Sequence, residues 1–230
     1  MFSTFDFEVI QRTLPYVIGE GLRFTLTLTL ISTLLGLMFG TALALMRLSP
    51  LKMLSAPAAL YVNLMRSLPL VLVIFWFYFL APYIGQVMFQ TARPLKVGAF
   101  SSALITFSLF EAAYFCEILR AGIQSVARGQ VGAGLALGLT KAQLMRYVVM
   151  PQAVRNMLPV MLTQTIILFQ DTSLVYVLSL TDLLGAASVV ATRDGRMVEM
   201  YLFAGLIYFL ISFGASRLVR ALQARMAVIR

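Results

Sequence analysis

The sequence predicts an all-α integral membrane protein with about five transmembrane helices in a single domain, residues 1–230. Hydrophobic residues make up 60% of the chain and charged residues 12%, a composition typical of a protein whose solvent is mostly lipid. Five stretches are also long and apolar enough to cross a hydrocarbon core, which takes ~20 residues of helix. We detect no linker, low-complexity tract or convincing repeat, which favours one domain.

The five predicted spans follow one another along the whole chain. They cover roughly residues 22–46, 58–82, 99–119, 158–180 and 200–219. The second is irregular because Asn63, Arg66 and Pro69 interrupt its first half. Its unbroken part is too short to cross a membrane alone, so we expect the helix to begin near the interface and to pass Pro69 with a bend.

Basic residues predict the orientation of these spans, because loops rich in Lys and Arg stay on the cytoplasmic side. With five spans, the N-terminus and the loops after spans two and four share one side, which carries six basic residues against twelve on the other. We therefore expect the N-terminus outside, with 1–21 as an external segment, and the C-terminus inside, with 120–157 as a cytoplasmic loop. This sorting also explains the net charge of +9, so we expect no nucleic-acid partner.

Composition also argues against catalysis by this chain. It has no His, and its single Cys116 lies inside an apolar segment, which removes most metal sites and His-dependent acid–base chemistry. It also lacks a GxxxxGK[ST] phosphate loop. We expect no enzyme activity, no metal and no cofactor bound by the chain itself.

The cytoplasmic loop has local signals for a bent pair of helices. Gly138 suits the left-handed position just past a helix end, and Thr140 with Gln143 forms a capping box for a second helix. That helix, residues 141–150, should stop before Pro151.

The second loop helix should also be amphipathic. Leu144, Tyr147 and Val148 would lie on one face. A short amphipathic helix at a membrane surface can rest on lipid or enter a groove on a soluble partner.

Three acidic residues lie within the predicted spans, where charges are costly and should be paired or functional. Glu117 precedes Arg120 by three residues, so a local ion pair explains it. Glu111 lies about midway along its span with Tyr114 one turn later, and lines either a helix–helix contact or a polar path.

Asp171 belongs to a polar group that interrupts the fourth span. Because such groups would be left without partners in lipid, we expect a structural break that also contacts the pathway. The candidate substrate-pathway residues are Glu111, Tyr114, Gln170, Asp171, Thr172 and Ser173.

The loop also carries a longer pattern: Gly138, nine residues, Val148, any residue, Met150 and Pro151. It resembles the loop signature of bacterial ATP-binding-cassette importer permeases, EAA, three residues, G, nine residues, I-x-L-P. One departure is plain: the EAA triplet falls on residues 132–134, so the acidic residue is replaced by Gly132.

Four further segments resemble the polar amino-acid branch of that family. They are GLRFTLTLTL from Gly21, MRSLPLVLVIFWFYF from Met65, FEAAYFCEILRAGIQSVARGQ from Phe110 and LFQDTSLVYVLSLTDL from Leu168. More narrowly, FQDTSLVYVLSL and RDGRMVEMYLFAG look like a permease subunit of glutamate/aspartate importers.

The resemblance implies a type I importer permease in the bacterial inner membrane, with a cytoplasmic coupling helix that sits in a cleft of an ATPase. Expected partners are a homologous second permease or a second copy of this chain, two cytoplasmic ATPase subunits, an external amino-acid-binding protein and the lipid bilayer. ATP and Mg²⁺ would be bound by the ATPase. The residues expected to couple this chain to the ATPase are Gly132, Ala133, Gly134, Gly138, Leu139, Thr140, Leu144, Tyr147 and Pro151.

The implied substrate leaves a charge problem. Carboxylates in the pathway should attract cationic amino acids, whereas the nearest resemblance is to carriers of anionic ones. No Lys or Arg is predicted at the centre of a span, so a counter-ion would come from the partner permease, and Glu111 would serve the ammonium group of any amino acid.

Three alternatives stay open. The importer could carry another polar or basic amino acid. A secondary transporter would need no ATP, but such folds usually show matched broken helices in two halves. A membrane scaffold or assembly factor would need no polar path at all.

Overall fold

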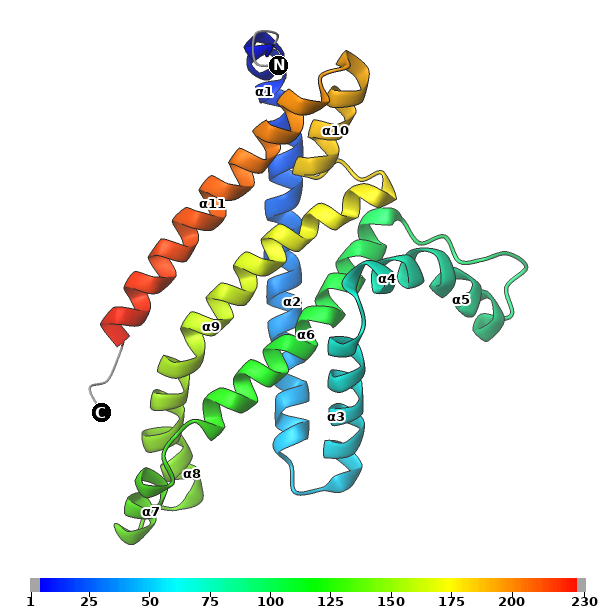
Figure 1. Ribbon diagram of the computed structural model, residues 1–230. Coiled ribbons are helices and arrows are strands. Elements are labelled where there is room, and N and C mark those ends of the chain that lie inside the picture. The colour runs from blue at the N-terminus through cyan, green and yellow to red at the C-terminus, as the bar shows by residue number, and fades with distance from the viewer. Residues whose placement is uncertain (1–4, 227–230) are drawn as a thin grey trace. The chain divides into compact units, whose positions relative to one another are not determined.

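A computed structural model describes residues 5–226 of the protein, and they form helices joined by short connections, except for a longer loop between α5 and α6 at residues 90–98 (Figure 1). In that part of the chain, five helical stretches are long and apolar enough to cross a membrane, which confirms the expected number. They are Phe7–Leu48, Leu70–Phe89, Ala99–Gln124, Lys141–Leu178 and Met197–Met226.

Several of these stretches join α-helices through a turn of another helical type. The elements are α1 (Phe7–Tyr16), a π-helical turn (Val17–Leu22), α2 (Arg23–Leu48), α3 (Lys52–Ser67), α4 (Leu70–Phe75), a π-helical turn (Trp76–Leu80), α5 (Ala81–Phe89), α6 (Ala99–Gln124), α7 (Arg128–Ala136), α8 (Lys141–Leu144), a π-helical turn (Met145–Val149), α9 (Met150–Asp171), a 3-10 helix (Thr172–Leu178), α10 (Leu183–Asp194) and α11 (Met197–Met226).

The second predicted span is wrong in one respect: the helix does not bend past Pro69 but breaks there. Helix α3 ends at Ser67, Leu68 and Pro69 are extended with ψ of 140° and 129°, and α4 begins at Leu70. A proline disfavours helical geometry in the residue before it, and a Pro can begin a helix without losing a hydrogen bond. The break therefore places α3 and the apolar stretch Leu70–Phe89 in separate helices.

Contacts divide the chain into two compact units. The first contains Met1–Leu34, Pro69–Ser108 and Ile166–Ala215, and the second contains Leu35–Leu68, Leu109–Thr165 and Ser216–Arg230.

The first unit has two apolar clusters. In one, Val9 and Val17 from the N-terminal helix pack against α10 and α11 through Leu183 and Met200. In the other, Phe107 of α6 is fully buried with Leu28 and Leu168 among its neighbours. Asp6 caps α1 by accepting from the backbone N–H of Glu8 at 2.9 Å, so the residues before the first predicted span are helical.

In the second unit, two glycines let α2 approach α6 closely. A Cβ added at Gly36 would lie 2.7 Å from the Cβ of Glu111, and one at Gly40 would lie 2.8 Å from the Cβ of Phe115. Glycines four residues apart on one helix face are a common device for close packing in membranes. The Tyr61 hydroxyl donates to the Leu109 carbonyl at 2.8 Å and ties α3 to the same helix.

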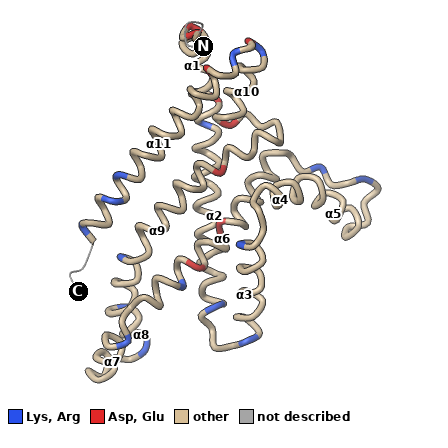
Figure 2. The backbone as a smooth tube through the Cα atoms, in the orientation of Figure 1, with Lys and Arg blue, Asp and Glu red and all other residues tan. Residues whose placement is uncertain are grey.

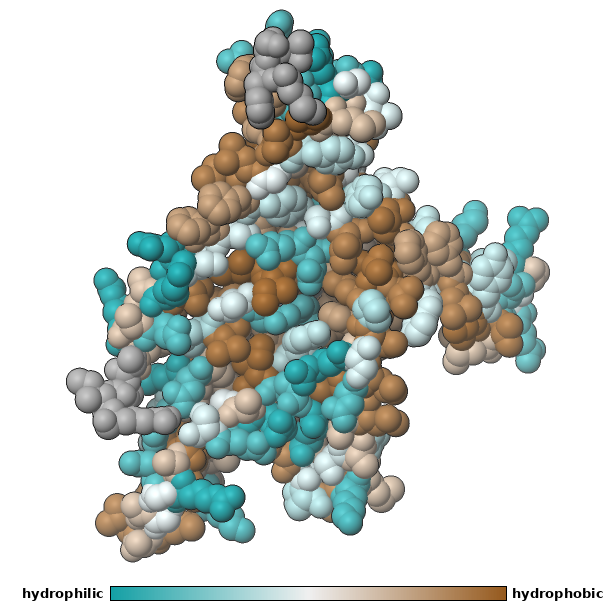
Figure 3. Space-filling model, in the orientation of Figure 1, coloured by the Kyte–Doolittle hydropathy of each residue, from teal (hydrophilic) through white to brown (hydrophobic). Residues whose placement is uncertain are grey.

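The outward faces of the long helices are apolar, as lipid requires. On α11 these exposed residues include Leu206, Phe209, Leu210 and Phe213. Figure 3 shows this apolar covering along α11 and around α4 and α5. Charged residues gather instead toward helix ends, such as Arg217, Arg220 and Arg225 at the end of α11 (Figure 2).

Candidate functional site

The turn between α7 and α8, in the loop that joins α6 to α9, forms as the sequence predicted. Helix α7 ends at Ala136, and Gly138 adopts a φ of +79° just beyond it. This left-handed residue lets Leu139 N–H donate to the Gly134 carbonyl at 3.1 Å, which satisfies a carbonyl at the helix end. The chain is thereby reversed before α8.

The capping box at the start of α8 is also confirmed. Gln143 N–H donates to the Thr140 hydroxyl at 3.3 Å, and Thr140 N–H donates back to the Gln143 side-chain oxygen at 2.9 Å. Both hydrogen bonds join residues three positions apart, so the local sequence is enough to determine where this helix begins.

The predicted stop at Pro151 is wrong. The helix passes from α8 through the π-helical turn Met145–Val149 into α9, and Met150 keeps helical φ and ψ of −61° and −42°. A wider π-helical turn just before the proline gives room to the ring, which would clash with the carbonyl four residues earlier in a regular helix. Helix α9 therefore begins at Met150, eight residues before the predicted start of the fourth span at Leu158.

The same turn separates two residues that we expected on one face. Leu144 is buried with Val126, Val149 and Ala153, and it fills the space that a side chain at Gly134 would need. Tyr147 is 63% exposed. Leu144 therefore holds the loop together from inside, and Tyr147 belongs to its outer surface.

We call the outer surface formed by Leu135, Leu137, Met145 and Tyr147 the coupling surface, after the role that the sequence predicts for this loop, and it is both apolar and basic. Leu137 is 82% exposed at the end of α7, and Leu135 and Met145 are exposed as well. Gly132 is exposed, with open space where a side chain would start. Figure 2 shows basic residues around α7 and α8, where the sequence has Arg128, Lys141 and Arg146. Sequence reasoning missed Leu135 and Leu137 because no periodic pattern marks them.

Of the coupling residues predicted from sequence, all except Pro151 lie in α7, α8 and the turns beside them, and Pro151 lies in the first turn of α9. Ala133 and Thr140 are exposed, Leu139 is half-buried against the loop's core, and Pro151 is exposed on α9.

Glu111 lies in the buried part of the second unit. It is 1% exposed, and it accepts a hydrogen bond from the Gln164 side-chain amide at 3.0 Å. This contact joins α6 to α9, as expected for a helix–helix role. Tyr114, one turn further along α6, lies under the guanidinium of Arg66, whose central carbon is 5.4 Å from the ring centroid.

Glu117 is paired more extensively than the sequence suggested. It meets Arg120 at 2.7 Å as predicted, and also contacts Arg47 of α2 and, at 3.8 Å, Arg66 of α3. Three helices thus converge on one carboxylate.

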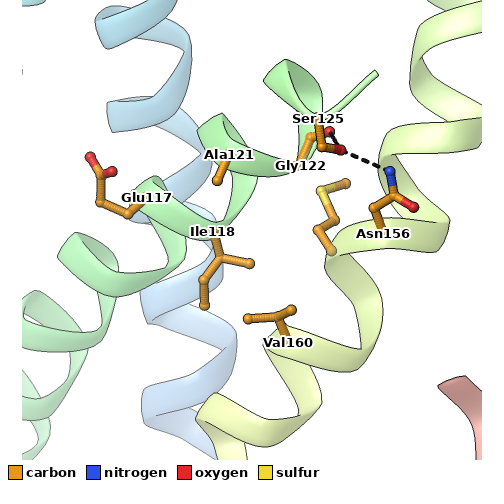
Figure 4. A pocket seen from close by; sticks show the side chains of 8 residues that line it. Glu117, Ile118, Ala121, Gly122, Ser125, Asn156 and Val160 are labelled. Atoms are coloured by element: carbon orange, nitrogen blue, oxygen red, sulfur yellow. Dashed lines mark hydrogen bonds between the residues drawn. The ribbon is translucent and has the colours of Figure 1, made fainter. Parts of the chain in front are cut away.

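A cavity of about 310 Å³ lies between α6 and α9 in this unit (Figure 4). Ile118 and Val160 approach each other across it, whereas the Glu117 carboxylate points away from them. At one edge the Asn156 amide donates to the Ser125 hydroxyl at 2.8 Å. The cavity is therefore mainly apolar.

The remaining pathway candidates lie in the first unit, where α9 ends. Thr172 is buried, and its hydroxyl donates to the Phe169 carbonyl at 2.7 Å. Asp171 and Ser173 are half-buried and Gln170 is exposed. The helix changes to the 3-10 type at Thr172, so the expected interruption of the fourth span is present as a tightened helix.

Sequence reasoning missed Asp182, although an Asp before an apolar helical run is a readable capping signal. It caps α10 by accepting from Leu184 N–H and Gly185 N–H, each at 3.0 Å, and from the Tyr208 hydroxyl at 3.3 Å. Burial outweighs these hydrogen bonds and raises the pKa of Asp182 from 3.8 to about 6.

This raised pKa predicts a pH-dependent stability. The folded state binds the proton more tightly than the unfolded state, so the contribution of Asp182 is greatest at acid pH and is lost as the pH rises through about 6. We expect the melting temperature of the detergent-solubilised complex to fall more steeply between about pH 4 and about pH 6 in the native protein than in Asp182→Asn, which keeps a neutral cap. Parallel pH profiles of the two proteins would contradict this assignment.

Comparison with known proteins adds to this geometry. Residues 22–228 match the family described as "Binding-protein-dependent transport system inner membrane component". The glutamate/aspartate import permease protein GltK of Escherichia coli O6:H1 is 50% identical to the chain over 223 residues. The matched region covers 97% of this chain and 99% of GltK. The chain is 31% identical over 206 residues, 90% of each chain, to the arginine transport system permease protein ArtQ of Bacillus subtilis. The crystal structure of an amino acid ABC transporter with histidines superposes with a TM-score of 0.87 at 32% identity, over 96% of this chain and 99% of the other.

Proposed function

Because the chain belongs to the family of binding-protein-dependent transport system inner membrane components, we propose that it is the permease subunit of an ATP-driven importer for glutamate and aspartate. The observation that carries the substrate is the 50% identity with a glutamate/aspartate import permease over nearly the whole of both chains.

The chain is an inner-membrane permease subunit of an amino-acid ABC importer, and its all-helical fold is that of type I importer permeases. Its relatives are transport components rather than catalysts.

The coupling surface is the part of the chain that would meet the ATPase. Its exposed Leu137 and Tyr147 supply apolar contact, and the basic residues around them suit an acidic rim on the partner. Because Gly132 replaces the acidic residue of the family signature, docking here would depend on shape and apolar contact. ATP and Mg²⁺ would be bound by the ATPase, and closure of its two subunits would move this loop.

The complete importer would contain this chain, a second permease or a second copy of it, two ATPase subunits and an external binding protein. The proposed docking of the loop on a cytoplasmic ATPase would place the α7–α8 segment inside the cell. The N-terminus would then lie outside and the C-terminus inside, as positive-inside sorting predicts.

The test is uptake of radiolabelled glutamate, aspartate and arginine into proteoliposomes that hold the purified complex, with ATP inside and the binding protein outside. We expect uptake of glutamate and aspartate that requires ATP. Uptake of arginine alone would overturn the substrate assignment, and uptake driven by an ion gradient without ATP would overturn the mechanism.

A further inference from the structure

One carboxylate in the second unit faces three guanidinium groups. Glu117 lies 2.7 Å from Arg120 and 3.8 Å from Arg66, and it also contacts Arg47. The three arginines come from α6, α3 and α2. We call these four residues the arginine cluster.

The arginine cluster carries excess positive charge. Arginine stays protonated at any physiological pH, so one carboxylate against three guanidinium groups leaves a surplus of about two charges. Inside a membrane protein such a surplus is costly unless an anion offsets it or water reaches it.

Arg66 is the least tightly paired arginine of the cluster. Its distance of 3.8 Å from Glu117 is beyond hydrogen-bonding range, whereas Arg120 lies at 2.7 Å. The Arg66 side chain is 42% exposed, against 16% for Arg47 and 29% for Arg120. Arg66 is therefore the member of the cluster most available to another anion.

Tyr114 holds this guanidinium in place. The ring centroid lies 5.4 Å from the guanidinium carbon, within the range of a cation–π interaction. A guanidinium packed over a ring keeps its N–H edge open, and that edge matches a carboxylate through two parallel hydrogen bonds.

The surroundings of Arg66 are polar rather than lipid-like. On α3, Asn63 one turn earlier and Ser67 next to it are both exposed. Figure 3 shows hydrophilic side chains gathered on the lower part of the molecule between α6 and α3. Helix α3 has 16 residues and is not among the stretches long and apolar enough to span a membrane. An aqueous solute, and not an acyl chain, fits such a surface.

We infer that Arg66, held over Tyr114, binds the side-chain carboxylate of the acidic amino acid as it passes through the permease. The inference rests on the proposed function and names the group that distinguishes glutamate and aspartate from their amides. It removes the charge problem posed by Glu111, because the chain itself supplies the cation that sequence reasoning assigned to the partner. Arg66 is then a specificity-determining residue of the pathway.

Direct binding tests this role without the selectivity of the external binding protein. The permease–ATPase complex is placed in nanodiscs, and equilibrium binding of radiolabelled glutamate is measured with unlabelled glutamine as competitor. We expect Arg66→Gln to raise the dissociation constant of glutamate by about tenfold to a hundredfold, the range for one charge-assisted carboxylate contact. The inhibition constant of glutamine should be the same as in the native complex. Arg66→Lys keeps the positive charge but not the two parallel N–H donors of the guanidinium, so it should weaken glutamate binding less than Arg66→Gln does.

The matched control is Lys52→Gln, which removes one exposed positive charge from the first turn of the same helix. It should bind glutamate like the native complex, and ATPase activity shows that every variant is assembled. The inference is overturned if the native complex binds no glutamate, if Arg66→Gln binds it normally, or if glutamate and glutamine weaken together. ATP-dependent glutamate uptake by the native complex, measured in parallel, decides the proposed function separately.

Discussion

Replacing Gly40 with valine should prevent the permease from folding into a stable complex. A Cβ at this position would lie 2.8 Å from the Cβ of Phe115, 2.9 Å from the carbonyl oxygen of Ala112 and 3.1 Å from the amide nitrogen of Cys116. Two of these three atoms belong to the backbone of α6, which cannot rotate aside as a flexible side chain can. Helices α2 and α6 would have to separate, which costs about 3 kcal/mol or more at the upper end of overpacking effects.

Fluorescence size exclusion and melting temperature in detergent measure this effect. We expect Gly40→Val to give little monodisperse complex, and Gly40→Ala to give a folded complex that melts earlier. The matched control is Gly205→Val on α11, where an added Cβ meets nothing within 4 Å. Equal melting temperatures for Gly40→Val and the native complex would show that the two helices do not pack through this glycine.

The close approach of α2 and α6 is a contact between helices that the sequence did not predict. Composition and the length of apolar stretches predicted the fold class and the number of spans, because lipid constrains each helix by itself. Which helices meet is not a property of one stretch, and Gly36 and Gly40 look like any other glycines until α6 is placed beside them.

The loop shows the same division between local and distant causes. Gly138 and the pair Thr140 and Gln143 were predicted correctly because their hydrogen bonds join residues a few positions apart. The π-helical turn before Pro151 was not predicted, and it moves Leu144 into the core while Tyr147 stays exposed. A regular helical period therefore placed Leu144 and Val148 together correctly but assigned Tyr147 to the wrong face.

Arg66 was misread for a related reason. Assigned to a long second span, it counted only as one more basic residue near a membrane surface. Helix α3 ends at Ser67, and Arg66 in its last turn contacts Glu117 and Tyr114 of α6. No spacing within the sequence links residue 66 to residues 114 and 117.

Replacing Gly138 with valine should uncouple ATP hydrolysis from transport. The residue has a φ of +79°, and a β-branched side chain in this conformation costs at least ~1–2 kcal/mol. The cost is strain and not a clash, since a Cβ at Gly138 meets nothing within 4 Å. The turn that joins α7 to α8 would change its path and carry the coupling surface away from the ATPase.

We expect the Gly138→Val complex to hydrolyse ATP while ATP-dependent uptake falls by about tenfold or more, since a displaced loop cannot transmit closure. Gly129→Val is the matched control, because Gly129 also has open space around it but lies in the first turn of α7 without a positive φ.

A second variant, Tyr147→Asp, leaves the turn intact and places a charge on the coupling surface, where the side chain is exposed. It should weaken ATPase binding and uptake together. If both variants transport normally, the ATPase docks elsewhere on the chain.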